Sequence, residues 1–204
     1  MIYEMRTYML KPGTTPEFEE RFAEAMPHRQ KYSRLGAFWH TEVGPLNQVI
    51  HVWPYEDMAE RTRVRAAAAQ DPNWPPRSQE LIMSQETEIL LPAPFMRPLE
   101  PRQMGSIYEM RIYAYQNGAI PEVLKRWEGL IKERESHSLL AACWYTDVGA
   151  LNKFIHVWPY RDFAERERVR QESRRNGHWP PPTREFLLRQ ENKLLAPAAF
   201  SPLK

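Results

Sequence analysis

The chain has 204 residues, of which 42% are hydrophobic, and this is enough to build buried cores of ordinary size. Its 28 Lys and Arg residues against 26 Asp and Glu give a weak, interleaved net charge of +2, which excludes the basic surface typical of nucleic-acid-binding proteins. One cysteine (Cys143), no apolar run of membrane-span length and no signal-peptide pattern lead us to expect a cytoplasmic protein with no membrane span.

The first predicted elements are a strand and a helix. Residues 2–9 are rich in Tyr, Met and Ile, a composition typical of strands. Residues 16–35 have the spacing of charged and apolar residues that favours an amphipathic helix. Pro27 should kink or interrupt this helix, because proline lacks the N–H that an inner turn requires.

A hairpin is predicted next. Residues 37–43 and 48–54 have strand character and flank a short loop at residues 44–47. Asn47 ends that loop, and asparagine tolerates left-handed backbone geometry better than most residues. We therefore interpret Asn47 as a turn residue.

A second helix and a last strand complete the pattern. Asp57 followed by Glu60 is typical of a helix N-cap with an acidic third residue, and the helix should run to about Gln70. A strand is predicted near residues 84–91. The order strand, helix, strand, strand, helix, strand is the ferredoxin-like pattern.

The second half of the chain repeats the first. The run Ile-Tyr-Glu-Met-Arg at residues 2–6 recurs at 107–111, an offset of 105 positions that continues without a gap to residues 95 and 200. We therefore expect two copies of one domain, at residues 1–95 and 106–204. The proline-rich linker at 96–105 favours an extended path, which lets the second copy start in an equivalent position.

These features predict an α+β fold. A ferredoxin-like sheet carries its helices on one face and leaves the other uncovered, and the second copy can cover it. We predict two tandem ferredoxin-like βαββαβ repeats whose antiparallel sheets pack as an intrachain α+β barrel, a pseudo-dimer within one chain. A further homodimer of whole chains is left open.

The strand at residues 2–8, the hairpin and strand at 44–55 and the helix at 57–65 together resemble the NIPSNAP family of the dimeric α+β barrel superfamily, and the second half resembles it equally. The resemblance implies that this tandem chain is a homodimeric barrel made covalent. Related barrel families include cofactor-independent monooxygenases, haem-degrading enzymes, chlorite dismutases and isomerases. The resemblance therefore implies a pocket without naming its reaction.

Four side chains of the first copy are expected to converge beside a cleft. Period-two alternation places Glu4 and Arg6 on one face of the first strand, and His51 and Trp53 on one face of its neighbour, the third. Arg6 would hold an anionic or carbonyl group, His51 would exchange a proton near neutral pH, and Trp53 would form an apolar wall. Trp74, in a Trp-Pro-Pro run, could cover the cleft. The counterparts in the second copy are Glu109, Arg111, His156, Trp158 and Trp179.

Structural roles compete with these functional ones. Glu4 and Arg6 can simply pair within the sheet while His51 satisfies a backbone group. Trp39 and its counterpart Trp144 suit the core of a small barrel. The arginines that follow the predicted N-cap favour a solvated helix face over an anion-binding edge; they are Arg61, Arg63 and Arg65.

The sequence has no glycine-rich phosphate loop, nucleophile-elbow serine or paired-cysteine spacing, so we expect no bound metal and no cofactor.

The leading hypothesis is a NIPSNAP-like protein that binds a small, partly apolar molecule in a cleft of each half. One alternative is a cofactor-independent oxygenase or isomerase with His51 or His156 as acid/base. The other is a non-enzymatic scaffold or protein-interaction module, which predicts no enclosed cleft beside His51. Differences between the copies, such as His40 against Tyr145, suggest the hypothesis that one cleft was retained and the other relaxed.

Overall fold

The computed structural model describes residues 1–175 and 177–204, and it contains the predicted element order twice. The first repeat consists of β1 (Ile2–Leu10), α1 (Thr15–Gln30), β2 (Ala37–Val43), β3 (Gln48–Tyr55), α2 (Met58–Ala68), the short 3₁₀ helix η1 (Gln79–Leu81) and β4 (Ile82–Pro92). The second repeat consists of β5 (Ile107–Tyr115), α3 (Ile120–Glu135), β6 (Ala142–Val148), β7 (Lys153–Tyr160), α4 (Phe163–Glu172), η2 (Arg184–Phe186) and β8 (Leu187–Pro197).

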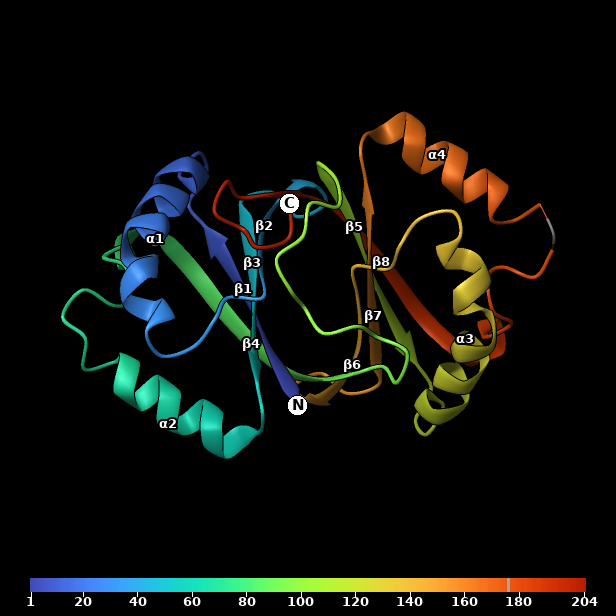
Figure 1. The fold of residues 1–204 in the computed structure, drawn as a ribbon, viewed down its shortest axis with the longest axis horizontal. Coiled ribbons are helices and arrows are strands. Elements are labelled where there is room, and N and C mark those ends of the chain that lie inside the picture. Colours follow the sequence, from blue (N-terminus) through green and yellow to red (C-terminus); the bar gives the residue numbers. More distant parts are fainter. Residues whose placement is uncertain (176) are drawn as a thin grey trace.

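The eight strands close into a single barrel in the order β1-β3-β2-β8-β5-β7-β6-β4. Each repeat contributes a four-stranded antiparallel sheet, and the two sheets join through the antiparallel pairs β2–β8 and β4–β6. Closure leaves no unpaired sheet edge exposed. Helices α1 and α2 lie outside one half, and α3 and α4 lie outside the other (Figure 1). The predicted intrachain α+β barrel of two ferredoxin-like repeats is confirmed.

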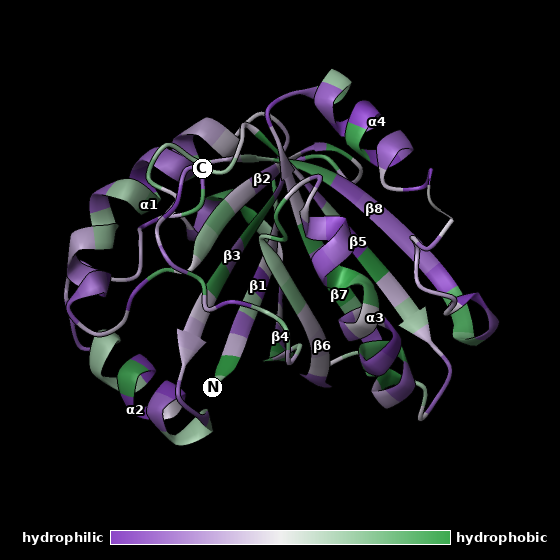
Figure 2. Ribbon diagram, turned by 45° about the vertical axis from the view of Figure 1, so that its right-hand side comes forward, coloured by the Kyte–Doolittle hydropathy of each residue, from purple (hydrophilic) through white to green (hydrophobic). Residues whose placement is uncertain are grey.

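The barrel interior is filled by alternate side chains of both repeats. Tyr3 packs against Trp144 with ring centroids 5.7 Å apart, and Trp39 packs against Tyr108 at 5.5 Å. All four are almost completely buried in one core cluster, as predicted for the two tryptophans. Figure 2 shows hydrophobic segments along β3 and β7 and hydrophilic stretches on the helices outside. The strand residues that alternate with these interior ones face the helices.

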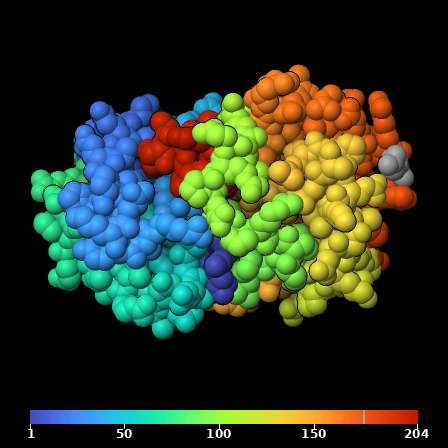
Figure 3. All heavy atoms as spheres, viewed as in Figure 1, coloured from blue at the N-terminus to red at the C-terminus, as the bar shows by residue number. Residues whose placement is uncertain are grey.

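The proline-rich linker is packed onto the barrel. Leu99 is buried in the interior cluster, and Met96 and Met104 pack against the same cluster. The backbone N–H of Arg102 donates to the carbonyl of Pro202 at 2.9 Å. The linker and the C-terminal segment lie side by side on the face between the two halves (Figure 3). In the part of the chain that the structure describes, no helix has the length and hydropathy of a membrane span.

Helix α1 differs from its prediction. It passes through Pro27 and ends at Gln30, so the extension to residue 35 is wrong, and of the kink or interruption predicted at Pro27 the interruption does not occur. Buried Met26 and Arg29 hold the helix on both sides of the proline, and only the last turn lies beyond it. The equivalent helix α3, with Lys132 in place of Pro27, ends at the corresponding Glu135. The end of the helix is therefore a property of the shared fold.

The predicted caps and turns are confirmed. Asp57 Oδ1 accepts a hydrogen bond from the Glu60 backbone N–H at 2.8 Å, and α2 begins there. Asn47 and Asn152 both have φ of 60°, the left-handed geometry expected of turn asparagines. These local features fix where α2 and β3 begin, and both elements contribute to the site.

Candidate functional site

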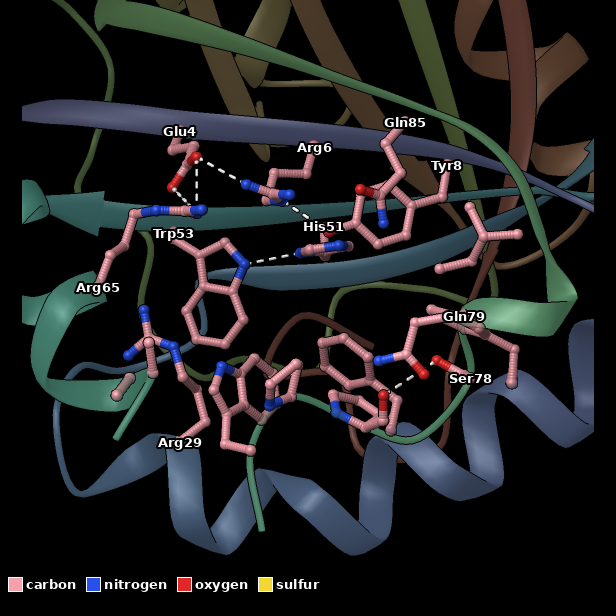
Figure 4. Close-up of a pocket in the computed structure, with 18 of the residues that line it drawn as sticks. Glu4, Arg6, Tyr8, Arg29, His51, Trp53, Arg65, Ser78, Gln79 and Gln85 are labelled. Carbon is pink, nitrogen blue, oxygen red and sulfur yellow. Dashed lines mark hydrogen bonds and ion pairs between the residues drawn. The ribbon is translucent and has the colours of Figure 1, made fainter. Parts of the chain in front are cut away.

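Each repeat has a partly open cavity between the outer face of its sheet and its helices. The cavity of the first repeat has a volume of about 350 Å³, and that of the second about 380 Å³. Side chains from β1, β3, α1, α2 and the segment before β4 line the first cavity (Figure 4). The scaffold hypothesis predicted no enclosed cleft beside His51; this histidine lines a partly open cavity, and its side chain is almost completely buried against aromatic rings.

The register of β1 and β3 brings the predicted residues together. Arg6 is paired with His51 and Glu4 with Trp53 across the two antiparallel strands. All four line the first cavity, together with Trp74. The second cavity is lined by the five counterparts, Glu109, Arg111, His156, Trp158 and Trp179. The structure therefore brings together every residue that the sequence assigned to the two clefts, and the roles of these residues are proposed below.

Glu4 is the centre of a buried charge cluster. Its carboxylate is completely buried and accepts hydrogen bonds from Arg61 at 2.7 Å and from Arg65 and Arg6 at 3.1 Å each. Burial acts to raise the pKa of Glu4, but the Arg61 hydrogen bond and the charges of Arg65 and Arg6 outweigh it and lower the pKa to about 2. Glu4 is therefore ionised at neutral pH. Arg61 and Arg65 do not form a purely solvated helix face, whereas Arg63 is exposed.

The second repeat builds the same cluster. Glu109 accepts hydrogen bonds from Arg166 at 2.8 Å and from Arg170 at 2.9 Å, with Arg111 at 3.4 Å. Burial raises the pKa of Glu109, but the Arg166 hydrogen bond and the neighbouring guanidinium charges produce a net lowering. Both clusters tie the second helix of the repeat to the first strand, and they fix one end of each cavity.

His51 is a neutral hydrogen-bond donor. Trp53 Nε1 donates to His51 Nδ1 at 2.6 Å, and because an indole nitrogen only donates, the imidazole proton is on Nε2. Burial, together with the charge of Arg6, lowers the pKa of His51 to about 3. Its Nε2 atom is buried and has no hydrogen-bond partner among the described residues. An imidazole in this state does not exchange protons readily at pH 7, but it can donate to a ligand.

His156 has the same environment. Trp158 Nε1 donates to His156 Nδ1 at 2.7 Å, and burial lowers the pKa of His156 well below its usual value. Its buried Nε2 atom also finds no partner in the described part of the chain. The two repeats thus keep one arrangement, in which a tryptophan fixes the histidine tautomer and leaves one N–H group available.

Aromatic rings form the walls of the cavity, and an arginine stacks on them. The Arg29 guanidinium lies 4.4 Å from the centroid of the Trp53 ring and donates to the Tyr55 hydroxyl at 2.9 Å. Trp74 packs at 5.5 Å from Phe22, beside Pro75 and Pro76, and covers this side of the cavity. In Figure 4, Trp53 lies between Arg29 and His51. The walls are apolar, while the donors are confined to a few positions.

The lining of the first cavity has an excess of positive charge. Three arginines, Arg6, Arg29 and Arg65, and one carboxylate, Glu4, line it, so the charges sum to +2 while His51 is neutral. The sequence prediction missed Arg29, and it favoured a solvated helix face over an anion-binding edge for Arg65. A signal was present, because both recur at the equivalent positions 134 and 170. Among the described residues, no group of three His, Cys, Asp or Glu side chains is arranged to hold a metal ion.

Comparison with known proteins agrees with the duplicated architecture. The NIPSNAP family model matches residues 3–97 and 108–202. The human protein NipSnap homolog 3A is 32% identical over 218 residues, covering 100% of this chain and 86% of the human protein, and mouse NipSnap homolog 3B is 32% identical over 216 residues, covering 99% and 85%. A candidate monooxygenase from Fusobacterium nucleatum has the same fold, with a TM-score of 0.68 over 97% of this chain and 92% of that protein, at 8% identity. Two family matches, one to each repeat, show that this chain belongs to the NIPSNAP family.

Proposed function

We propose that each repeat binds a small organic anion with an apolar body in its cavity. The observation that carries this proposal is the buried, unpartnered Nε2–H group of His51 in a cavity that also has an excess of guanidinium charge. A buried donor without a partner is costly, and an acceptor oxygen on a ligand would remove that cost. The aromatic walls would hold the apolar part of the same ligand.

The arrangement favours an anion over a neutral ligand. Glu4 is already satisfied by three arginines, so the ligand has no free carboxylate to pair with in this cavity. Arg29 lies over Trp53, where its planar guanidinium can face a carboxylate and keep its contact with the ring. A cationic ligand would meet like charges. A neutral one would leave the positive excess uncompensated.

His51 would contribute by orienting the ligand. With Nδ1 occupied by Trp53 and the proton on Nε2, the imidazole can donate one hydrogen bond in a fixed direction. This role replaces the acid/base role that the sequence suggested, because a pKa of about 3 leaves the imidazole a weak base at pH 7.

Isothermal titration calorimetry with a matched pair of probes tests the proposal. The full chain is titrated with 2-naphthoate, which is an aromatic monoanion, and with 2-naphthamide, its neutral analogue of nearly the same shape. We expect 2-naphthoate to bind and 2-naphthamide to bind about ten-fold more weakly, because the amide loses the charge-assisted hydrogen bonds. Equal affinities, or no binding of 2-naphthoate, would contradict the proposal.

A pair of double variants locates the binding. Arg65→Gln with Arg170→Gln removes one cavity guanidinium from each repeat, 41% exposed in Arg65 and 21% exposed in Arg170, and should weaken 2-naphthoate binding. Arg63→Gln with Arg168→Gln changes arginines of the same two helices that do not line the cavities, and should leave the affinity unchanged. A similar loss in both double variants would show that the surface charge, and not the cavity, attracts the probe.

A further inference from the structure

The two cavities differ in their buried hydrogen-bond donors. Trp127 of the second repeat stands at the position of Phe22 in the first, and each lines the cavity of its own repeat. The Trp127 side chain is almost completely buried, and its Nε1 atom has no partner among the residues that the structure describes. Its ring centroid lies 4.6 Å from that of His156, whose Nε2 is also unpartnered. The second cavity therefore has two neutral, unsatisfied donors on adjacent rings, where the first has His51 alone.

The lining of the second cavity also carries more positive charge than the lining of the first. Arg174 and Arg184 line the second cavity, where the first repeat has Ala69 and Gln79. Neither arginine forms an ion pair with another described side chain, and both are exposed at the rim. Five arginines and one carboxylate therefore give the second lining a charge of +4, against +2 in the first. The second set consists of Arg111, Arg134, Arg170, Arg174, Arg184 and Glu109.

From these two differences we infer that the second cavity binds an organic dianion whose head group presents several acceptor oxygens, as a phosphate monoester does, while the first cavity binds a monoanion. This inference rests on the proposed function and assigns each repeat its own ligand class. A phosphate monoester carries between one and two negative charges near pH 7 and has three strong acceptor oxygens. Trp127 and His156 would donate to that head group inside the cavity, and the two rim arginines would balance its second charge.

The donor type supports an oxygen-rich head group. An indole N–H group donates and never accepts, and His156 has its remaining proton on Nε2 because Trp158 occupies Nδ1. Both groups therefore require acceptors from the ligand. A carboxylate has two oxygens, one for each ring donor, whereas a phosphate monoester has three strong acceptor oxygens and can accept from a rim arginine as well.

The test uses 2-naphthyl phosphate and 2-naphthoate in calorimetric titrations of the full chain at pH 8. We expect 2-naphthyl phosphate to bind one site per chain more tightly than 2-naphthoate does. Trp127→Phe, which introduces the residue of the first repeat, should weaken the binding of 2-naphthyl phosphate by about ten-fold or more, since a hydrogen bond to a charged group is lost. The mirror variant Phe22→Trp should strengthen phosphate binding in the first cavity.

Two further variants keep the test decisive if Trp127→Phe alters the core. Arg174→Ala and Arg184→Gln replace exposed rim residues with those of the first repeat, and together they should weaken the binding of 2-naphthyl phosphate by a larger factor than that of 2-naphthoate. Two equal sites for the phosphate, or a phosphate affinity unaffected by these changes, would overturn the division of ligands and leave the proposed function standing. Binding of neither probe would overturn both.

Discussion

Lys153 of the second repeat donates a hydrogen bond of 2.8 Å to Glu88 of the first, across the junction between the two repeats. At the pseudo-symmetric position of the other junction, Lys193 donates to Gln48 at 2.9 Å. The second repeat therefore contributes a lysine to each junction, Lys153 to one and Lys193 to the other. If two copies of the second repeat paired with each other through the same junctions, Lys153 would lie against Lys193. The charges favour pairing of unlike repeats and disfavour pairing of second repeats between chains.

A charge exchange tests this junction. Lys153→Glu alone brings two carboxylates together and should lower the free energy of unfolding by about 1–2 kcal/mol, since both side chains are mostly buried. Adding Glu88→Lys should restore most of that loss. Urea unfolding of the single and double variants measures the coupling, and Lys125→Glu, at an exposed position of helix α3, is the charge-matched control. Strictly additive effects would show that the pair does not contribute to the junction.

The Glu4 cluster should contribute strongly to stability. Glu4→Gln leaves buried guanidinium groups without their counter-charge, and removing one partner of a buried ion pair typically costs about 3–5 kcal/mol. We expect a loss of this order in urea unfolding at pH 7. Glu86→Gln, at an exposed position of β4, should change the stability by less than about 0.5 kcal/mol. A Glu4→Gln variant as stable as the parent chain would contradict the charge cluster.

Acid should destabilise the fold through His51. Because folding lowers the pKa of His51 to about 3, the unfolded chain takes up the proton first as the pH falls. The stabilising contribution is complete above the unfolded pKa of about 6.5 and is lost as the pH falls towards 3, by roughly 5 kcal/mol in all. Urea unfolding of the parent chain and of His51→Gln between pH 7 and pH 4 measures it. The variant should show a flatter profile, and parallel profiles would contradict the buried neutral histidine.

The histidine tautomer can be observed directly. In long-range ¹⁵N–¹H spectra, His51 and His156 should both be neutral with the proton on Nε2 at pH 7, because tryptophan occupies Nδ1 in each case. His40 provides an internal contrast, since its hydrogen bond with Glu19 raises its pKa. On lowering the pH, His40 should therefore protonate well before His51. An Nδ1-protonated His51 would contradict the donor role.

The sequence was sufficient for the fold and for the part of the site that lies on strands. Period-two alternation and the order of β1 and β3 predicted the neighbourhood of Arg6 and His51, because the strand period and the sheet order determine both. The contribution of α1 to the site was missed, because the contact between Arg29 and Trp53 depends on the angle at which the helix crosses the sheet. The pKa of His51 depends on burial and on the charge of Arg6, and its tautomer depends on the tryptophan hydrogen bond; no local pattern encodes either.

A crystal structure of the full chain with 2-naphthoate tests the central claim most directly. Our account predicts the naphthalene ring against Trp53 and Trp74, with a carboxylate oxygen within hydrogen-bond distance of His51 Nε2 and near Arg29. The equivalent position beside His156 should also be occupied at saturating probe. Empty cavities under these conditions, or a probe bound only elsewhere on the surface, would contradict the assignment of these cavities as ligand-binding sites.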